Sequence, residues 1–194
     1  MAVTAVVFDV GETLVDETST CERLADAAGV PRFTFMALAG AAIVRGLQPQ
    51  DVVWDWLGVE PPPPVTFDDD QLYPDVLPCL RELRARGLRV GAAGNMGSAN
   101  EAMLRAHVDF VGSSGSWGVS KPAAGFFERL AAEADLPAGE IAYVGDRVDN
   151  DVEPALAAGM VAVHVRRGPW GFLFDAPRGA IRIDSLAELP EALL

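Results

Sequence analysis

The sequence predicts an α/β protein with a parallel sheet flanked by helices and a small inserted helical subdomain. Short, continuously apolar runs alternate with helical patterns along most of the chain, which is typical of a buried parallel sheet. The segment from Asp16 to about Tyr73 breaks this alternation and contains helical patterns only. A hydrophobic fraction of 50% and a charged fraction of 22% exclude a disordered chain.

The predicted strands begin with the valine-rich run Val3–Phe8, which ends at Asp9. In Pro78–Arg86, the spacing places Leu77, Leu80 and Leu83 on one inward face, and Gly87 ends the helix. The other predicted strands are Leu88–Ala93, Phe110–Gly112, Ile141–Val144, Val161–Val165 and Ile181–Ile183. The other predicted helices are Phe126–Ala134, Asp151–Ala158 and Ser185–Leu194.

The inserted segment carries three helical patterns, Ser19–Ala28, Thr34–Arg45 and Gln50–Leu57. A stiff, polar connector that includes Pro61–Pro64 follows them. We therefore expect a core domain made of residues 1–15 and 74–194, with a helical insert at residues 16–73.

The charge balance limits the classes of partner. The 194 residues contain 15 Lys and Arg against 28 Asp and Glu, a net charge of −13, and no clustered basic stripe. This argues against binding to nucleic acid or to an anionic membrane surface. No apolar run approaches the roughly 18 residues of a spanning helix.

The two cysteines and the first residues of the sequence bear on location. Cys21 and Cys79 fit no metal-binding spacing, and two reduced, packed thiols are expected. The opening MAVTAVVFDVGETL has no basic segment of the kind that begins a signal peptide. We therefore expect a cytoplasmic protein.

Two carboxylates follow predicted strands that could be neighbours. Asp9 ends the first apolar run, and Asp146 ends the fourth. Ligands of open α/β sheets bind at the carboxyl ends of the strands, and paired carboxylates there suit Mg²⁺. Lys121, after the third run, could reach the same edge. Such a set would form a phosphoryl-transfer site with a nucleophile, a cation and a metal ligand.

Four segments in this order resemble the motifs of the haloacid dehalogenase-like (HAD) hydrolase superfamily. They are FDVGETLVDE at Phe8–Glu17, LRVGAAGN at Leu88–Asn95, GVSKP at Gly118–Pro122 and YVGDRVDNDVEPALAAGM at Tyr143–Met160. The resemblance covers nearly the whole chain, and the last segment is the most specific. It implies a Rossmann-like core, a mobile cap in place of the insert, a Mg²⁺ cofactor and an aspartyl-phosphate intermediate.

The resemblance also implies roles for single residues. Asp9 matches the nucleophile and a metal ligand, and Asp146 matches a second metal ligand. Lys121 matches the catalytic residue that neutralises Asp9 and binds the phosphoryl oxygens of the substrate. Asp151 would orient Lys121 or the water around the metal, and Thr13 would support the loop after Asp9.

Two positions depart from the family pattern. Gly11 stands where the family's phosphatases have an Asp that serves as general acid and base, although its carbonyl can still bind the metal. Gly94 replaces the Ser or Thr that holds a phosphoryl oxygen, while Asn95 matches the next family residue. Gly94 would then bind substrate through its N–H group. Loss of the general acid is expected to slow alkyl phosphate hydrolysis by about 10²–10⁴-fold.

Three functions follow from these observations. We expect a phosphatase that acts on a small phosphorylated substrate, with activity weakened by Gly11. A HAD-fold binding or regulatory module without catalysis is the alternative from another class. A haloacid dehalogenase would also lack the second Asp, but that branch does without Mg²⁺, and Gly145-Asp146 argues against it.

The charge of the insert suggests a preference among substrates. Residues 16–75 contain eleven acidic and three basic residues, a net charge of −8. Like charge near a cleft disfavours multiply charged ligands, so we expect one phosphate on a neutral or cationic body. The oligomeric state is not indicated by the sequence.

The glycine at position 11 makes a testable prediction. Gly11→Asp should raise kcat/KM for alkyl phosphates by up to about 10²-fold. It should change p-nitrophenyl phosphate hydrolysis much less, because that leaving group needs little protonation. Gly11→Asn is the control without an acid. Equal effects on both substrates would mean that the missing acid does not limit turnover.

Overall fold

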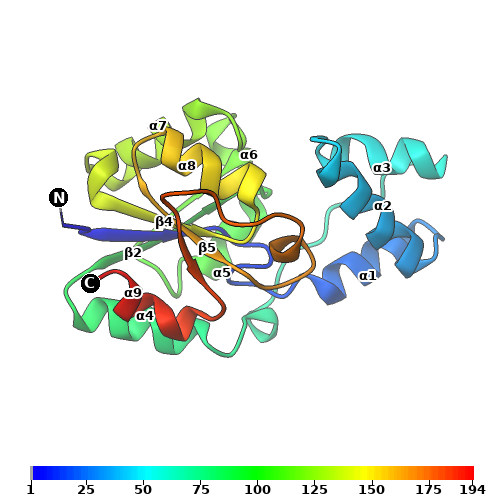
Figure 1. Ribbon diagram of the computed structural model, residues 1–194. Helices are drawn as coiled ribbons and strands as arrows, with labels where there is room; N and C mark the ends of the chain where they lie inside the picture. Colours follow the sequence, from blue (N-terminus) through cyan, green and yellow to red (C-terminus); the bar gives the residue numbers. More distant parts are fainter. Residues whose placement is uncertain (1) are drawn as a thin grey trace. The chain divides into compact units, whose positions relative to one another are not determined.

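The computed structural model describes residues 2–194 and divides the chain into two compact units (Figure 1). The first unit combines the chain up to Asp16 with Asp68–Leu194, and the second is Glu17–Phe67. The predicted insert ended at residue 73, whereas residues 68–73 belong to the first unit in the structure. That the second unit is a mobile cap stays a prediction.

The first unit is built on a six-stranded sheet in which every strand pair is parallel. The spatial order is β3-β2-β1-β4-β5-β6, so the first strand lies in the middle. This confirms the predicted α/β class with a Rossmann-like parallel sheet. The strands are β1 (Ala5–Phe8), β2 (Arg89–Gly94), β3 (Phe110–Ser113), β4 (Ile141–Gly145), β5 (Val161–Val165) and β6 (Ile181–Ile183).

Helices cover both faces of this sheet. Figure 1 shows α7 and α8 on one face and α4 and α9 on the other. The helices are α4 (Val76–Ala85), α5 (Glu101–Leu104), α6 (Ser114–Trp117), α7 (Ala124–Ala134), α8 (Glu153–Ala157) and α9 (Leu189–Ala192), with a π-helix at Val148–Val152. Short 3₁₀ helices lie at Asp69–Gln71, Ser98–Asn100, Ala138–Glu140, Trp170–Phe172 and Leu186–Glu188.

Aromatic side chains fill the core between the sheet and α7. Phe127 packs edge-on against Phe126 and against Tyr143 of β4, with ring centroids 5.5 and 5.3 Å apart. All three rings are fully buried. Burial of rings this large contributes much of the hydrophobic stabilisation and holds α7 against the sheet.

Helix α4 buries a different face from the predicted one. Leu80 and Leu83 are buried as expected, but Leu77 is 38% exposed, and Val76 and Cys79 fill the inward positions. The reason is the helical period, because positions 76, 79, 80 and 83 lie on one stripe of a 3.6-residue helix. The helix ends before Gly87, as predicted, and φ at Gly87 is +82°.

Two predicted helices are interrupted. The Asp151–Ala158 pattern is a π-helix over Val148–Val152 followed by α8. The Ser185–Leu194 pattern is a 3₁₀ turn that Ser185 caps, followed by the short α9.

The second unit consists of three helices, α1 (Thr18–Ala27), α2 (Arg32–Val44) and α3 (Pro49–Leu57). Pro49 begins α3 and Gly58 ends it in the left-handed conformation, a typical pairing of start and stop residues. Phe35 of α2 stacks on Trp54 of α3, with ring centroids 4.9 Å apart. This contact holds the two helices together.

Two properties of the second unit bear on the sequence predictions. Glu17–Phe67 contains six acidic and three basic residues, so its net charge is only −3, and the remaining acids belong to the first unit. The charge argument for substrate selection therefore loses most of its basis. Among residues 2–194, no single helix meets the length and hydropathy of a membrane span. Helices α1 and α2 meet them only together, bent by 111°.

Helix α4 offers a matched test of core packing. Leu83→Ala should lower the free energy of unfolding by about 2–5 kcal/mol, because the fully buried side chain leaves a cavity. Leu77→Ala, on the same helix but 38% exposed, should cost less than about 1 kcal/mol. Urea denaturation measures both, and equal costs would contradict the packing described for α4.

Candidate active site

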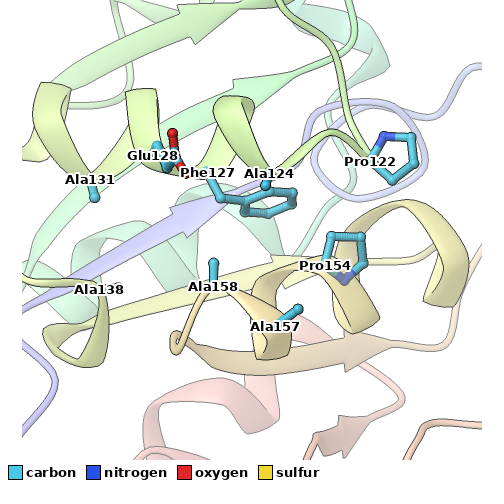
Figure 2. A pocket seen from close by; sticks show the side chains of 9 residues that line it. All are labelled: Pro122, Ala124, Phe127, Glu128, Ala131, Ala138, Pro154, Ala157 and Ala158. Atoms are coloured by element: carbon cyan, nitrogen blue, oxygen red, sulfur yellow. The ribbon is translucent and has the colours of Figure 1, made fainter.

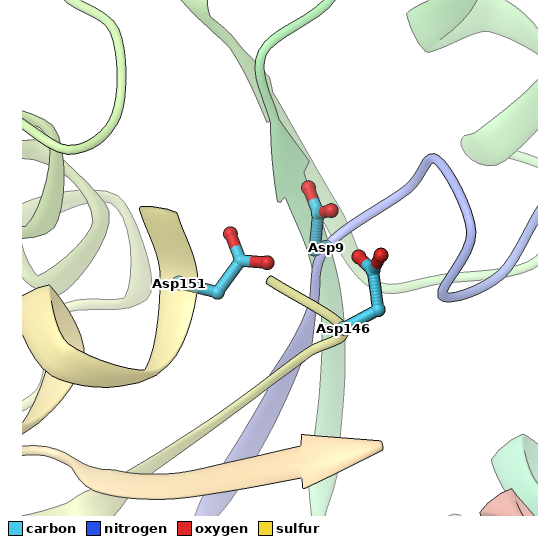
Figure 3. Close-up of side chains that lie close together, drawn as sticks. All are labelled: Asp9, Asp146 and Asp151. Carbon is cyan, nitrogen blue, oxygen red and sulfur yellow. The ribbon is translucent and has the colours of Figure 1, made fainter. Parts of the chain in front are cut away.

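Three carboxylates meet at the carboxyl edge of the sheet. Asp9 follows β1 and Asp146 follows β4, while Asp151 lies on the π-helix (Figure 3). One oxygen from each lies within 4.8 Å of the others. The strand order explains this meeting, because β1 and β4 are neighbours and the Asp9 N–H donates to the carbonyl of Val144 at 2.8 Å.

Lys121 joins two of these carboxylates. Its Nζ donates to Asp9 Oδ1 and to Asp151 Oδ1, both at 2.5 Å. The side chain is 1% exposed, and Nζ lies 5.5 Å from the centre of the Tyr143 ring. Burial lowers the pKa of Lys121, but the charges of Asp151 and Asp9 outweigh it and raise the pKa well above its ordinary value. Lys121 is therefore a fixed cation.

Asp146 is less well compensated. Its Oδ1 accepts a hydrogen bond from Thr13 Oγ1 at 3.4 Å, whereas its buried Oδ2 has no hydrogen-bond partner among residues 2–194. Burial raises the pKa of Asp146 well above its usual range, and the charges of Asp151, Asp9 and Glu12 raise it further. A buried oxygen of this kind is a place for a cation.

Asp9 is mostly buried but keeps a small solvent-exposed fraction. Burial raises its pKa to about 6, although the Lys121 charge lowers it. Its exposed fraction is 8%, while Asp146 and Asp151 are at most 1% exposed. Of the three carboxylates, Asp9 is the one that solvent can reach.

The π-helix and a glycine place Asp151. Its N–H and that of Val152 both donate to the Arg147 carbonyl, at 2.8 and 3.3 Å, and its Oδ2 accepts from the Arg147 N–H at 3.0 Å. A Cβ on Gly145 would lie 2.5 Å from the Asp151 Cβ and Cγ. Position 145 therefore needs a glycine for Asp151 to approach Lys121.

The predicted substrate-binding residues lie beside Lys121. The Asn95 amide donates to the Lys121 carbonyl at 2.9 Å and accepts from the Lys121 N–H at 2.8 Å. Asn95 therefore holds the backbone of Lys121, and its contact with a substrate stays a prediction. A Cβ on Gly94 would lie 2.6 Å from Asp9 Oδ1, so the glycine lets β2 approach the carboxylate closely.

The loop after Asp9 turns tightly. The N–H groups of Leu14 and Val15 both donate to the Val10 carbonyl at 2.9 Å, and Gly11 bridges to Val15. Thr13, predicted to support this loop, reaches Asp146 from it.

Sequence reasoning missed two contributors near this loop and strand β5. His164 of β5 is buried, and its Nε2 lies 3.0 Å from the Asp146 carbonyl. Its Nδ1, however, has no hydrogen-bond partner in the described chain. Tyr73 donates from its hydroxyl to Glu12 Oε2 at 2.6 Å, a contact between distant positions that no motif signals.

A cavity of about 420 Å³ lies between α7 and α8 (Figure 2). It is mainly apolar, with Glu128 as its one charged lining residue. None of the three clustered carboxylates lines it, so it is separate from the site described above. The lining residues are Pro122, Ala124, Phe127, Glu128, Ala131, Ala138, Pro154, Ala157 and Ala158.

A family model described as haloacid dehalogenase-like hydrolase matches residues 48–159, which is more than half of the chain. The chain belongs to the HAD-like hydrolase family. This confirms the resemblance stated from the four motifs.

Two archaeal relatives of this HAD protein are named glyceraldehyde 3-phosphate phosphatase. The Methanopyrus kandleri protein is 31% identical over an alignment 198 residues long. This alignment covers 86% of this chain and 85% of that protein. The Methanocaldococcus jannaschii protein is 35% identical over 123 residues, which cover 60% of this chain and 54% of that protein. This second match thus spans about half of the relative's length.

Solved HAD structures share the fold. A HAD phosphatase from Thermococcus onnurineus has a TM-score of 0.67 at 21% identity, covering 100% of this chain and 98% of that one. An L-2-haloacid dehalogenase has a TM-score of 0.70 at 18% identity, with both chains covered completely. Because both activities occur on this fold, fold similarity alone does not distinguish them.

The poorly compensated Asp146 makes a prediction about stability. Without divalent cations at pH 7, Asp146→Asn should raise the free energy of unfolding by about 1 kcal/mol or more, because it removes a carboxyl group whose ionisation is opposed by burial. A raised carboxyl pKa means that the bound proton stabilises the fold at low pH and is lost as pH rises through that pKa. The difference from wild type should therefore widen as pH rises.

Urea denaturation at pH 7 and at lower and higher pH, with and without Mg²⁺, tests the prediction. Mg²⁺ should stabilise the wild type and leave the variant nearly unchanged. Asp175→Asn, at an exposed position of the same unit, is the control. A destabilised variant in cation-free buffer, or equal stabilisation of both proteins by Mg²⁺, would contradict this account of Asp146.

Proposed function

We propose that this HAD protein is a Mg²⁺-dependent phosphatase that hydrolyses small phosphomonoesters through Asp9. The observation that carries the proposal is the arrangement around Lys121. One buried cation contacts the partly accessible Asp9 and the buried Asp151, while an oxygen of Asp146 faces the same edge without a partner among residues 2–194. A nucleophile, a fixed positive charge and an anionic ligand for a metal are the parts of a phosphoryl-transfer site.

Asp9 would act as the nucleophile. One of its carboxylate oxygens bonds to phosphorus as the bond from phosphorus to the leaving oxygen breaks. The leaving oxygen then takes a proton. Water next attacks the phosphorus of the aspartyl-phosphate, which releases inorganic phosphate and restores the Asp9 carboxylate. Lys121 would hold Asp9 in place and donate hydrogen bonds to the phosphoryl oxygens. Its positive charge would offset the repulsion between these oxygens and the carboxylates.

The side chains fit a divalent cation. Asp9 and Asp146 supply the hard oxygen donors that Mg²⁺ prefers, and Gly11 would add its carbonyl. Asp151 already forms an ion pair with Lys121 and would orient Lys121 or the water around the metal. The unpartnered Oδ2 of Asp146 supports this assignment. When bound, Mg²⁺ supplies positive charge to the phosphoryl oxygens.

Gly11 offers no side-chain acid to the leaving oxygen. The proton would then come from water, which favours leaving groups that are stable as anions. The names of the two archaeal relatives support a small phosphorylated metabolite of the triose phosphate type as substrate. A cytoplasmic location suits such a substrate, and we propose it on that basis.

One observation favours the binding or regulatory alternative. Lys121 Nζ donates a hydrogen bond to Asp9 Oδ1 at 2.5 Å. If this hydrogen bond persisted with Mg²⁺ present, it would hinder the attack of that oxygen on phosphorus. The dehalogenase alternative receives no comparable support, because the Asp146 oxygen that lacks a partner in the described part of the chain suits a cation.

Kinetics with Mg²⁺ test the proposed function. Wild type should hydrolyse p-nitrophenyl phosphate, and Asp9→Asn should lower kcat by about 10³-fold or more, because it removes the nucleophile. Asp149→Asn, at a partly exposed acid two residues before Asp151, is the control and should keep most of the activity. Equal activity of Asp9→Asn and wild type would exclude Asp9 as the nucleophile.

A further inference from the structure

Glu12, three residues after Asp9, has an unusual backbone conformation. Its φ is +55°, in the left-handed region that residues with a Cβ seldom adopt. Its side chain is also buried, with 3% of the residue exposed. Such a conformation persists only where the surroundings hold it, so the contacts of Glu12 should show what it does.

The Glu12 carboxylate is held from two sides. The Tyr73 hydroxyl donates to Oε2 at 2.6 Å. On the other side, a Cβ on Gly168 would lie 2.1 Å from the same oxygen, so the carboxylate lies against a bare backbone. Burial and the charge of Glu12 raise the pKa of Tyr73, which keeps its hydroxyl protonated as a donor.

Arg167 fixes Tyr73 in turn. Its guanidinium lies 4.5 Å from the centre of the Tyr73 ring, within the range of a cation–π contact. The same group donates to the Thr13 carbonyl at 3.3 Å and to Asp75 Oδ1 at 3.0 Å. Arg167 therefore contacts the loop after Asp9 and the segment that carries Tyr73 at the same time.

These contacts bear directly on Asp146. Thr13 follows Glu12 in the chain and donates to Asp146 Oδ1. The Glu12 N–H donates to the Val15 carbonyl at 2.7 Å, which closes the loop. If Glu12 left the left-handed conformation, the direction of the chain at Thr13 would change and the contact with Asp146 would be lost.

We propose that Glu12 and Tyr73 are positioning residues whose hydrogen bond holds the loop after Asp9 in its working geometry. The pair keeps Thr13 on Asp146 and thereby arranges the metal-binding edge. It acts through these neighbours and does not touch the substrate. The catalytic consequence rests on the proposed function, whereas the effect on the loop does not.

Hydrogen–deuterium exchange of the peptide spanning residues 9–16 tests this directly in the full-length protein. Tyr73→Phe and Glu12→Ala should each raise amide exchange in this peptide by about 10-fold, because each removes a hydrogen bond to a charged acceptor. Each should also weaken Mg²⁺ binding, measured by calorimetry, by about 10-fold. The double variant should be no worse than Glu12→Ala alone, because Tyr73→Phe then removes a donor whose acceptor is already gone.

Two further variants separate positioning from general destabilisation. Glu12→Gln keeps an acceptor oxygen for Tyr73 and should restore most of what Glu12→Ala loses. Glu133→Gln removes an exposed ion pair with Arg129 on α7 and should leave loop exchange unchanged. Exchange measured at temperatures where every variant is folded removes any effect of global unfolding.

The proposal is overturned if Tyr73→Phe leaves loop exchange within about two-fold of wild type, or if the two single effects multiply in the double variant. Amide exchange does not depend on turnover. A wild type without phosphatase activity would therefore count against the proposed function, and the exchange result would still decide the role of Glu12 and Tyr73.

Discussion

The buried ion pairs of Lys121 are the interaction on which the rest of the site depends. A cation with 1% exposure is tolerable only where anions meet it at short range, and Asp9 and Asp151 do so at 2.5 Å. This requirement explains features that look unrelated in the sequence. Asn95 forms two hydrogen bonds with the backbone of Lys121, and the π-helix places Asp151 beside the Lys121 side chain. Gly145 has no side chain because Asp151 occupies that space.

The same arrangement leaves one of the three carboxyl groups without an ion pair in the described chain. Two carboxylates share Lys121, and the third, Asp146, keeps an oxygen without a partner among the described residues. A polar edge that is short of positive charge suits a cation. The geometry thus links the stability of the fold to ligand binding. The excess negative charge at this edge destabilises the free protein, and a bound cation would neutralise it.

Much of this was predictable from the sequence. The apolar runs identified β1 to β5, because a strand buried on both faces is continuously apolar. Strand β6 was also placed correctly, although its central residue, Arg182, is exposed. The order of Asp9, Lys121 and Asp146 along the chain identified residues that the sheet brings to one edge. Contacts that depend on local backbone geometry were not predictable. The π-turn at Asp151 and the left-handed Glu12 have no compositional signal, and Tyr73 lies 61 positions from its partner.

We propose that Asp9 carries the phosphoryl group during turnover. Acid quenching of the wild type during hydrolysis of p-nitrophenyl phosphate with Mg²⁺, followed by peptide mapping by mass spectrometry, tests it most directly. One phosphoryl group is expected on the peptide that contains Asp9, and it should be lost again when the quenched protein is treated with hydroxylamine. Turnover with no phosphorylated peptide, or with the group on a different residue, would contradict it.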